Sequence, residues 1–287
     1  NQTMRDITED NITDAVIAAM QKAPSPRALE VLTSLVRHLH DFAREINLTT
    51  AEWEAGIQFL YDTGKISDEK RNEFILLSDI SGLSSLTDLI NRNDKSTESS
   101  VLGPFHVPDA PFVDVGGDLV KDNDGEHVVL SGTVRDGDGG PIPGAMLDVW
   151  QSDAKGVYQV EDPDQSDDNL RFRMICDAAG HYAFTTVKPS GYQAPTDGTG
   201  GIFLALGGRH AWRPAHIHLK LTADGYHPLI TELYVSNDKN IDEDIAFGVR
   251  ASLMLDFQAN SSPEAAAERG VKAPFYDISY DFTLAPV

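Results

Sequence analysis

The sequence predicts a mainly β protein with an α-helical N-terminal part, in which a helical domain over residues 1–100 precedes a β-sandwich domain over residues 101–287. Apolar residues recur at helical spacing in the first part. A polar stretch at residues 91–100 ends this pattern, and short alternating runs with frequent turns follow it. Many short strands separated by turns are typical of a β-sandwich.

Start signals locate the helices of the first part. Ser25 precedes a proline and predicts the N-cap of a helix that continues to about residue 46. Thr49 and Glu52 have the spacing of a capping box for a second helix. We expect a third helix from about residue 67 to about residue 82, and a short fourth helix over residues 86–90.

The first of these helices carries an apolar stripe at helical spacing. It comprises Leu32, Leu35, Leu39, Phe42 and Ile46. A lone helical arm cannot bury such a stripe completely, and exposed apolar patches mark partner surfaces. We therefore expect a homodimer that forms through the helical domain.

Alternating apolar residues and turn signals locate the strands of the second part. We expect strands at residues 127–134, 145–150, 170–176, 181–187, 216–221, 229–235 and 276–284. The short turn at residues 177–180 suggests that the two runs on either side of it form a hairpin.

Composition limits the possible partners and location. The formal net charge of −22 disfavours nucleic acid and anionic lipid surfaces as partners. Cys176 is the one cysteine, so an intrachain disulfide is impossible and a buried thiol is expected. No apolar run approaches the ~18 residues that a membrane span needs, and no signal peptide is visible. We expect a soluble cytoplasmic protein.

Two histidines on one predicted strand form a candidate metal site. His216 and His218 alternate with Ile217 and Leu219, so both imidazoles share one face of the strand. Positions i and i+2 are about 6.6 Å apart along a strand, and each metal–nitrogen bond is about 2 Å long, so both rings could bind one ion. The spacing alone leaves two interpretations open, a metal pair or two surface histidines.

Four motifs resemble the signature of the intradiol ring-cleavage dioxygenases, and the match extends over roughly residues 97–221. In order, residues 150–158 read WQSDAKGVY, 189–192 read PSGY, 195–198 read PTDG and 213–218 read RPAHIH. The N-terminal part resembles the helical linker domain of the catechol-type branch. The resemblance thus implies a helical linker and dimerisation domain, a catalytic β-sandwich, and dimer interfaces that enclose a phospholipid.

The resemblance also implies one non-haem Fe(III) per subunit. The implied ligands are Tyr158, Tyr192, His216 and His218. Phenolate is a hard anionic ligand, and a bound cation favours the ionised form of a phenol. In such enzymes Tyr192 would leave the metal and take a substrate proton, and Arg213 would stabilise negative charge on the substrate. An alternative role for Arg213 is a buried ion pair with a carboxylate.

Residues 97–107 and 74–79 are similar to the hydroxyquinol-cleaving branch of this family. The expected reaction is cleavage of a small aromatic triol or diol with O2 during aromatic-compound catabolism. Glu232 departs from the glutamine usual in catechol-type enzymes, which puts the substrate range in doubt. The expected substrate contacts are Leu76, Asp79, Val101, Leu102, Gly103, Pro104, Phe105, Ala194, Pro195, Arg213, Glu232 and Ile245.

Two alternatives remain beside hydroxyquinol cleavage. One is a catechol or substituted-catechol 1,2-dioxygenase, which would give muconates. The other belongs to a different class, a non-catalytic β-sandwich binding module with a helical dimerisation arm. Asp79 bears on the first choice, because its carboxylate could bind the additional hydroxyl of hydroxyquinol. Its alternative role is a local cap near Gly82.

Overall fold

A computed structural model describes residues 5–287, which separate into two compact units. The first unit extends to Tyr61 and the second comprises residues 62–287. Helices α4 (Glu73–Ile80) and α5 (Leu83–Asn91) therefore belong to the same unit as the strands. The domain boundary expected near residue 100 stays a prediction.

The first unit contains α1 (Ile12–Ala19), α2 (Pro26–Glu45) and the start of α3 (Thr50–Ile66). The predicted start of α2 is confirmed, because Oγ of Ser25 accepts a hydrogen bond from the backbone N–H of Ala28 at 3.1 Å. The capping box of α3 is also present. The N–H of Thr49 donates to Oε2 of Glu52 at 2.9 Å, and the N–H of Glu52 donates to Oγ1 of Thr49 at 3.2 Å. Helix α1 was not expected from the sequence.

Helix α4 begins at Glu73, later than the sequence suggested. A turn occupies the preceding residues, because Oδ1 of Asp68 accepts hydrogen bonds from the N–H groups of Lys70 and Arg71 at 2.7 and 2.8 Å. Asn72 then caps the helix through the N–H of Ile75. No helix within residues 5–287 has both the length and the apolar character needed to cross a bilayer.

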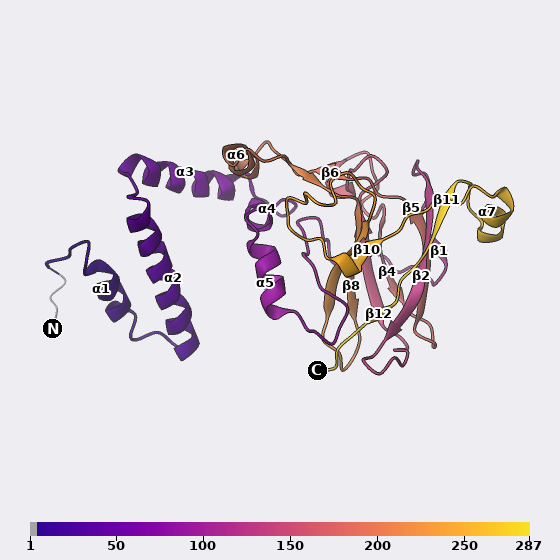
Figure 1. The fold of residues 1–287 in the computed structure, drawn as a ribbon, viewed down its shortest axis with the longest axis horizontal. Helices are drawn as coiled ribbons and strands as arrows, with labels where there is room; N and C mark the ends of the chain where they lie inside the picture. The colour runs from indigo at the N-terminus through magenta and orange to yellow at the C-terminus, as the bar shows by residue number, and fades with distance from the viewer. Residues whose placement is uncertain (1–4) are drawn as a thin grey trace. The chain divides into compact units, whose positions relative to one another are not determined.

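Two five-stranded sheets pack face to face in the second unit (Figure 1). The first has the order β10 (Met254–Leu255), β9 (Leu229–Val235), β8 (His216–Thr222), β3 (Met146–Gln151) and β4 (Arg171–Ile175). The second has the order β1 (Gly117–Asp118), β5 (His181–Val187), β2 (His127–Arg135) and β11 (Phe275–Ser279), and β12 (Phe282–Thr283) also pairs with β2. The predicted mainly β sandwich is confirmed.

The predicted hairpin of β4 and β5 is wrong. β4 pairs with β3 in the first sheet, whereas β5 pairs with β2 and β1 in the second. The turn at residues 177–180 therefore crosses from one sheet to the other. Phe172 of β4 and Phe184 of β5 meet in the core at a ring-centroid distance of 4.9 Å. The two strands therefore contact each other through buried apolar side chains and not through backbone hydrogen bonds.

The expected strand at residues 276–284 is also divided into two. Between β11 and β12, Asp281 accepts a hydrogen bond from the N–H of Thr133 at 2.9 Å. Its other oxygen accepts a hydrogen bond from Nε of Arg135 at 3.2 Å. Hydrogen bonds to the side chain of Asp281 thus replace backbone hydrogen bonds of the strand pair at this point.

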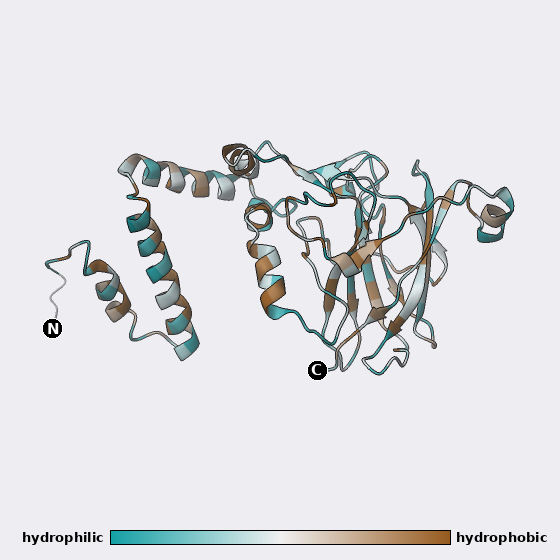
Figure 2. Cartoon of the chain, in the orientation of Figure 1, coloured by the Kyte–Doolittle hydropathy of each residue, from teal (hydrophilic) through white to brown (hydrophobic). Residues whose placement is uncertain are grey.

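Strand β8 separates the sandwich core from the opposite face of its sheet. Ile217, Leu219 and Leu221 are buried in the core between the sheets. His216 and His218 alternate with them and lie on the other face of the strand. Figure 2 shows hydrophobic and hydrophilic residues interspersed along the strands of the sandwich. Burial of each large aliphatic side chain contributes roughly 1.5–3 kcal/mol. The core therefore fixes which face presents the histidines.

Shorter elements complete the second unit. They are β6 (Tyr192–Gln193), β7 (Trp212–Arg213), α6 (Thr199–Leu206), α7 (Pro263–Arg269) and the 3-10 turns Gln159–Glu161 and Ala251–Leu253. β6 pairs antiparallel with β7, and Tyr192 lies opposite Arg213. Cys176 is buried as expected, and burial raises the pKa of its thiol to about 12.

Gly132 in β2 gives a direct test of the packing between β2 and the C-terminal segment. A Cβ at this position would lie 1.8 Å from the carbonyl oxygen of Tyr280. Gly132→Ala is expected to lower the free energy of unfolding by about 1–3 kcal/mol or more, measured by urea denaturation. Gly137→Ala is the control, because the added methyl group meets no atom within 4 Å. Equal stability of the two variants would contradict this packing.

Candidate metal centre

Neighbouring strands place the central side chains of the site in rows. His218 of β8 lies directly opposite Trp150 of β3 on one side and Glu232 of β9 on the other. His216 lies opposite Tyr234 in the next row. Paired residues in antiparallel strands project from the same face, so these five side chains share one face of the sheet. The ring of Trp150 stacks on that of His218 at 4.8 Å and an interplanar angle of 4°.

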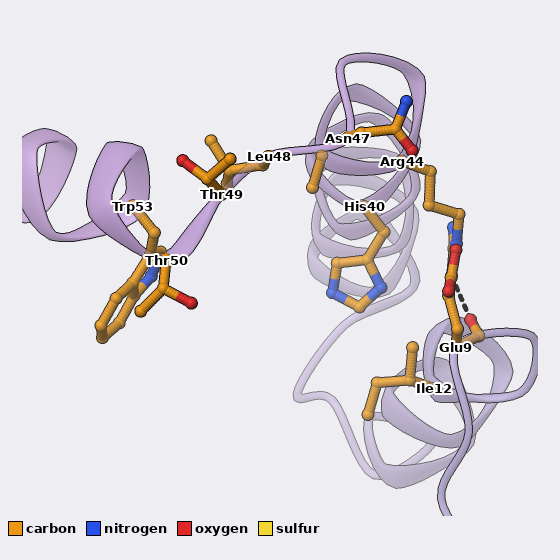
Figure 3. A pocket seen from close by; sticks show the side chains of 10 residues that line it. Glu9, Ile12, His40, Arg44, Asn47, Leu48, Thr49, Thr50 and Trp53 are labelled. Atoms are coloured by element: carbon orange, nitrogen blue, oxygen red, sulfur yellow. Dashed lines mark hydrogen bonds between the residues drawn. The ribbon is translucent and has the colours of Figure 1, made fainter.

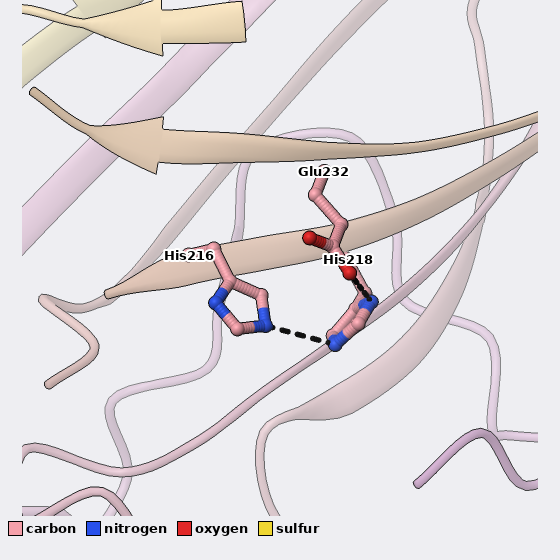
Figure 4. Close-up of side chains that lie close together, drawn as sticks. All are labelled: His216, His218 and Glu232. Atoms are coloured by element: carbon pink, nitrogen blue, oxygen red, sulfur yellow. Dashed lines mark hydrogen bonds and ion pairs between the residues drawn. The ribbon is translucent and has the colours of Figure 1, made fainter. Parts of the chain in front are cut away.

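The two histidines point one nitrogen each at a common position. Nε2 of His216 lies 3.1 Å from Nε2 of His218 (Figure 4). Nδ1 of His216 is 2.7 Å from the carbonyl oxygen of Pro214, a contact that requires its proton on Nδ1. Nδ1 of His218 lies 3.2 Å from Oε1 of Glu232, although this contact is not aligned as a hydrogen bond. Nε2 of His216 therefore carries a lone pair directed at Nε2 of His218, and a metal between the two nitrogens would take the tautomer of His218 that has its proton on Nδ1.

Protonation cannot easily relieve this contact. Burial lowers the pKa of His216, and the charge of Arg213 lowers it further. Burial also lowers the pKa of His218 far below its ordinary value, with His216 and Arg213 acting in the same direction. Two neutral imidazoles whose Nε2 atoms converge are donors suited to a metal cation.

Two tyrosines complete the cluster. The hydroxyl of Tyr158 lies 3.5 Å from Nε2 of His216, and the ring of Tyr158 meets that of Tyr192 edge-on at 5.3 Å. Both side chains are buried, and the hydroxyl of Tyr192 has no hydrogen-bond partner within residues 5–287. Burial raises the pKa of both phenols, so only a nearby cation would favour their ionised form.

Backbone geometry brings the two tyrosine segments together. Gly156 has φ +85°, and a Cβ there would lie 2.8 Å from the carbonyl oxygen of Gly191. Only glycine permits this approach without strain. The carboxylate of Glu161 accepts the N–H of Tyr158 at 3.1 Å and fixes the start of the following 3-10 turn. The β6–β7 pairing holds Tyr192 beside Arg213.

A second possible ligand set contains a carboxylate. Potential ligand atoms of His216, His218 and Glu232 all lie within 4.8 Å of one another. Glu232 faces Nδ1 of His218, however, and not the Nε2 atom that points toward His216. Its oxygens are also engaged by Nη1 and Nη2 of Arg213, at 3.1 and 2.7 Å. The two-tyrosine, two-histidine set uses the converging Nε2 atoms and leaves Glu232 in its contacts with Arg213.

Arg213 lies between two buried carboxylates. Besides Glu232, it binds Asp244 through Nε at 2.9 Å and Nη2 at 3.1 Å. Burial is the largest influence and would raise the pKa of both carboxyl groups, but the guanidinium charge and the hydrogen bonds to each carboxylate together hold each pKa below its ordinary value. The alternative role expected for Arg213, a buried ion pair, is therefore present. One positive and two negative groups give this trio a formal charge of −1.

A small cavity of about 20 Å³ lies beside the cluster. It is lined by eight of the residues expected to contact substrate, namely Leu76, Asp79, Pro104, Phe105, Ala194, Pro195, Arg213 and Ile245. Tyr192, Ile80 and Ala246 also line it. Phe105 stacks on Tyr158 at 4.4 Å and so connects the cavity wall to the tyrosine pair.

Four of the expected substrate contacts lie elsewhere around the cluster. Val101 is buried, and Leu102 packs against the group formed by Phe105, Trp150, Tyr158 and Tyr192. A Cβ at Gly103 would lie 3.1 Å from Cε1 of His218, so this residue lies against the histidine. Glu232 does not line the cavity. Its carboxylate accepts hydrogen bonds from Arg213, which lines the cavity, and from Tyr234, which does not.

Two important side chains were not expected from the sequence. Tyr234 donates a short hydrogen bond to Oε2 of Glu232. Its position two residues after Glu232 on one strand was a usable signal, because such residues share a face. Asp244 has no comparable signal, since it lies in an acidic loop whose other carboxylates, Asp242 and Glu243, are exposed.

Known proteins match this chain over nearly its whole length. A family model described as "Dioxygenase" matches residues 102–286, and one described as "Catechol dioxygenase N terminus" matches residues 25–99. An intradiol ring-cleavage dioxygenase of Aspergillus niger is 41% identical over 98% of this chain and 86% of its own length. The chain belongs to the intradiol ring-cleavage dioxygenases.

Two further relatives of this intradiol dioxygenase are similar over nearly their full lengths. The 6-chlorohydroxyquinol 1,2-dioxygenase of Cupriavidus pinatubonensis is 41% identical over 99% of both chains. The solved structure of a hydroxyquinol 1,2-dioxygenase from Pseudomonas putida DLL-E4 is 40% identical, with a TM-score of 0.87 over 97% of this chain and 99% of that one. Membership of this family implies a non-haem iron, and the tyrosine–histidine cluster has suitable donors for it.

Proposed function

We propose that this intradiol dioxygenase cleaves hydroxyquinol with O2 and gives maleylacetate. Both oxygen atoms enter the product, so the reaction adds two oxygens to the triol and releases none. The proposed metal is one Fe(III) per subunit, held by Tyr158, Tyr192, His216 and His218. Catabolism of aromatic compounds is the corresponding biological context.

One observation carries the proposal: the convergence of two neutral imidazoles and two buried phenols on a common position. Two phenolates would offset two of the three charges of Fe(III). The orphaned hydroxyl of Tyr192 supports a place in this set, because an unpaired buried hydroxyl is otherwise costly.

Each chain residue has a distinct part in the proposed reaction. When bound, Fe(III) would withdraw electron density from the substrate ring and make it susceptible to O2. Tyr192 would be a phenolate when it holds the metal, and its Oη atom, which has no competing hydrogen bond, could then take a proton from a substrate hydroxyl and become a neutral phenol. Arg213 lines the cavity and presents a hydrogen-bond donor to substrate oxygen. Phe105 and Ala194 exclude water from the ring.

Removal of one proposed ligand tests the metal set. Tyr158→Phe and His216→Ala are each expected to lose iron, the red-brown phenolate-to-Fe(III) colour and several orders of magnitude in activity. Iron content and the visible spectrum measure this outcome. Tyr226→Phe is the control, since Tyr226 lies in the turn between β8 and β9. Stoichiometric iron and full colour in either ligand variant would refute the proposed set.

Hydroxyquinol is favoured over catechol by a buried carboxylate in the cavity wall. Asp79 is 5% exposed, and burial raises its pKa to about 6, although a hydrogen bond from Ser84 and the charge of Arg213 oppose the shift. A site that hydrogen-bonds a substrate hydroxyl rejects an analogue without it. The names of the two hydroxyquinol-type relatives support the same substrate class.

Substitution of Asp79 should change discrimination between the two substrates. A hydrogen bond to a charged acceptor contributes roughly 1.5–3 kcal/mol, which is about ten- to a hundredfold in specificity. Asp79→Ala is expected to lower kcat/KM for hydroxyquinol by that factor and leave catechol turnover level or raised. Since the pKa is about 6, the preference for hydroxyquinol should increase as the pH rises through 6, and Asp79→Asn should remove this increase.

Stability gives an independent check on the same group. The raised pKa means that the folded state favours protonated Asp79, so its contribution to stability is complete below about pH 4 and is lost as the pH rises through 6. Asp122→Ala on the surface is the control for the measurement of substrate preference and for the measurement of stability. An equal fall in turnover of both substrates would assign Asp79 a structural role only.

A catechol 1,2-dioxygenase remains the alternative within this family, supported by the match to the catechol dioxygenase N-terminal model. A parallel assay with hydroxyquinol, catechol and chlorocatechol distinguishes the two from the products. A non-catalytic binding module is the alternative outside the family's chemistry, and a protein that stays colourless after iron reconstitution would favour it. The expected cytoplasmic location stays a prediction.

Homodimerisation through the helical domain is also part of the proposal. The predicted stripe, Leu32, Leu35, Leu39, Phe42 and Ile46, is 41–56% exposed along α2 and at its C-cap.

A pocket of about 680 Å³ lies between α1, α2 and the start of α3 (Figure 3). Arg44 donates to the carbonyl oxygen of Glu9 at its edge, while Ile12 and Trp53 supply apolar walls. Arg44 could bind the head group of a lipid, and the apolar walls could bind its tail.

The apolar stripe predicts the mass of the protein in solution. We expect a dimer at micromolar concentration, because an exposed apolar stripe of this kind is stabilised by burial against a second copy. Leu35→Glu with Leu39→Glu should give a monomer, measured by light scattering, whereas Arg27→Glu at the exposed start of α2 should not. A monomeric wild type would contradict this assembly. Mass spectrometry before and after delipidation tests for the phospholipid.

A further inference from the structure

Glu232, expected from the sequence to contact substrate, does not line the cavity and is among the most completely buried charged side chains in residues 5–287. Its Oε1 lies 3.1 Å from Nη1 of Arg213 and 3.2 Å from Nδ1 of His218. Its Oε2 accepts hydrogen bonds from Nη2 of Arg213 at 2.7 Å and from the hydroxyl of Tyr234. One carboxylate thus touches a proposed iron ligand and the arginine of the cavity.

We infer that Glu232 is a positioning residue, which orients His218 and Arg213 and places a negative charge behind the iron that favours Fe(III) over Fe(II). The inference rests on the proposed iron site. Strand pairing fixes its geometry, because Glu232 lies directly opposite His218 in the β8–β9 register. An outer carboxylate on the second nitrogen of a metal-binding histidine orients the ring and increases its donor strength.

The same contacts determine what Arg213 can offer to a ligand. A guanidinium has five N–H donors. Nε and one N–H of Nη2 are directed to Asp244, and Glu232 takes one N–H each from Nη2 and Nη1. One donor of Nη1 remains, and this atom lies 3.3 Å from Nε2 of His216. Glu232 therefore fixes the direction of this last donor of Arg213, which points to Nε2 of His216 at the proposed metal position.

The charge at residue 232 decides the net charge of this trio. Arg213, Glu232 and Asp244 together carry −1, whereas a glutamine at residue 232 would make the trio neutral. A nearby negative charge stabilises the more positive oxidation state of a metal. At an effective dielectric constant near 20, one charge several ångströms away changes the Fe(III)/Fe(II) ratio on the order of ten- to a hundredfold.

Glu232→Gln in the iron-loaded, full-length protein tests the inference, because it keeps the size of the side chain and removes its charge. We expect iron to stay bound, the reduction potential to become more positive, and the phenolate-to-iron absorption band to move to longer wavelength. Asp244→Asn is the matched control. It removes one negative charge from the same arginine without touching His218, so its shift should be clearly smaller.

Tyr234→Phe provides a second, opposite test if the glutamine variant does not fold. Loss of the hydroxyl that donates to Glu232 leaves the carboxylate charge less neutralised, so the potential should become more negative. Unchanged potentials in coloured Glu232→Gln or Tyr234→Phe protein would overturn the inference alone, as would an equal shift in Asp244→Asn. A wild-type protein without iron or colour would overturn the proposed function and the inference together.

Discussion

Strand β8 lies between two environments of opposite character, and the site depends on their separation. Ile217, Leu219 and Leu221 belong to the hydrophobic core of the sandwich, while His216 and His218 belong to a buried polar cluster on the other side of the sheet. A shift of the strand by one residue would exchange the two faces. The same burial that stabilises the sandwich therefore holds the imidazoles in register with Trp150, Glu232 and Tyr234.

The polar side of β8 contains more charge than a buried region can hold without compensation. Arg213 accommodates two carboxylates, and the backbone N–H groups of Ala246 and Gly248 donate to Asp244 at 3.1 and 2.9 Å. Such a cluster is weak evidence for added stability, because desolvation offsets much of the attraction. Its structural effect is orientation, since each oxygen and nitrogen has a fixed partner.

Local patterns predicted the parts of this structure that depend on neighbouring residues. The caps at Ser25 and Thr49, the strand at residues 229–235 and the shared face of His216 and His218 all follow from short-range spacing. The tyrosines were assigned only through resemblance, because nothing in the segments Gly156–Tyr158 and Gly191–Tyr192 specifies which phenols meet. Eight cavity residues were anticipated in the same way.

Sequence patterns did not predict the features that depend on distant parts of the chain. The turn at residues 177–180 has the residues of a hairpin, but the sheet that each flanking strand joins is decided by partners far along the chain. Asp244 is one carboxylate among several in its loop, and only the tertiary position of Arg213 distinguishes it. The delayed start of α4 came from a side-chain turn at Asp68 that competes locally with helix formation.

The pairing of β2 with β11 has a consequence for how the protein is made in a cell. Residues 127–131 pair in parallel with residues 275–279, so a central strand of the second sheet lacks one neighbour until nearly all of the sandwich sequence has left the ribosome. Pairings between residues so far apart in sequence fold slowly, and an unpaired strand edge is exposed meanwhile. Completion of this sheet is therefore a late event in folding, and the edge of β2 stays unpaired until residues 275–279 have been synthesised.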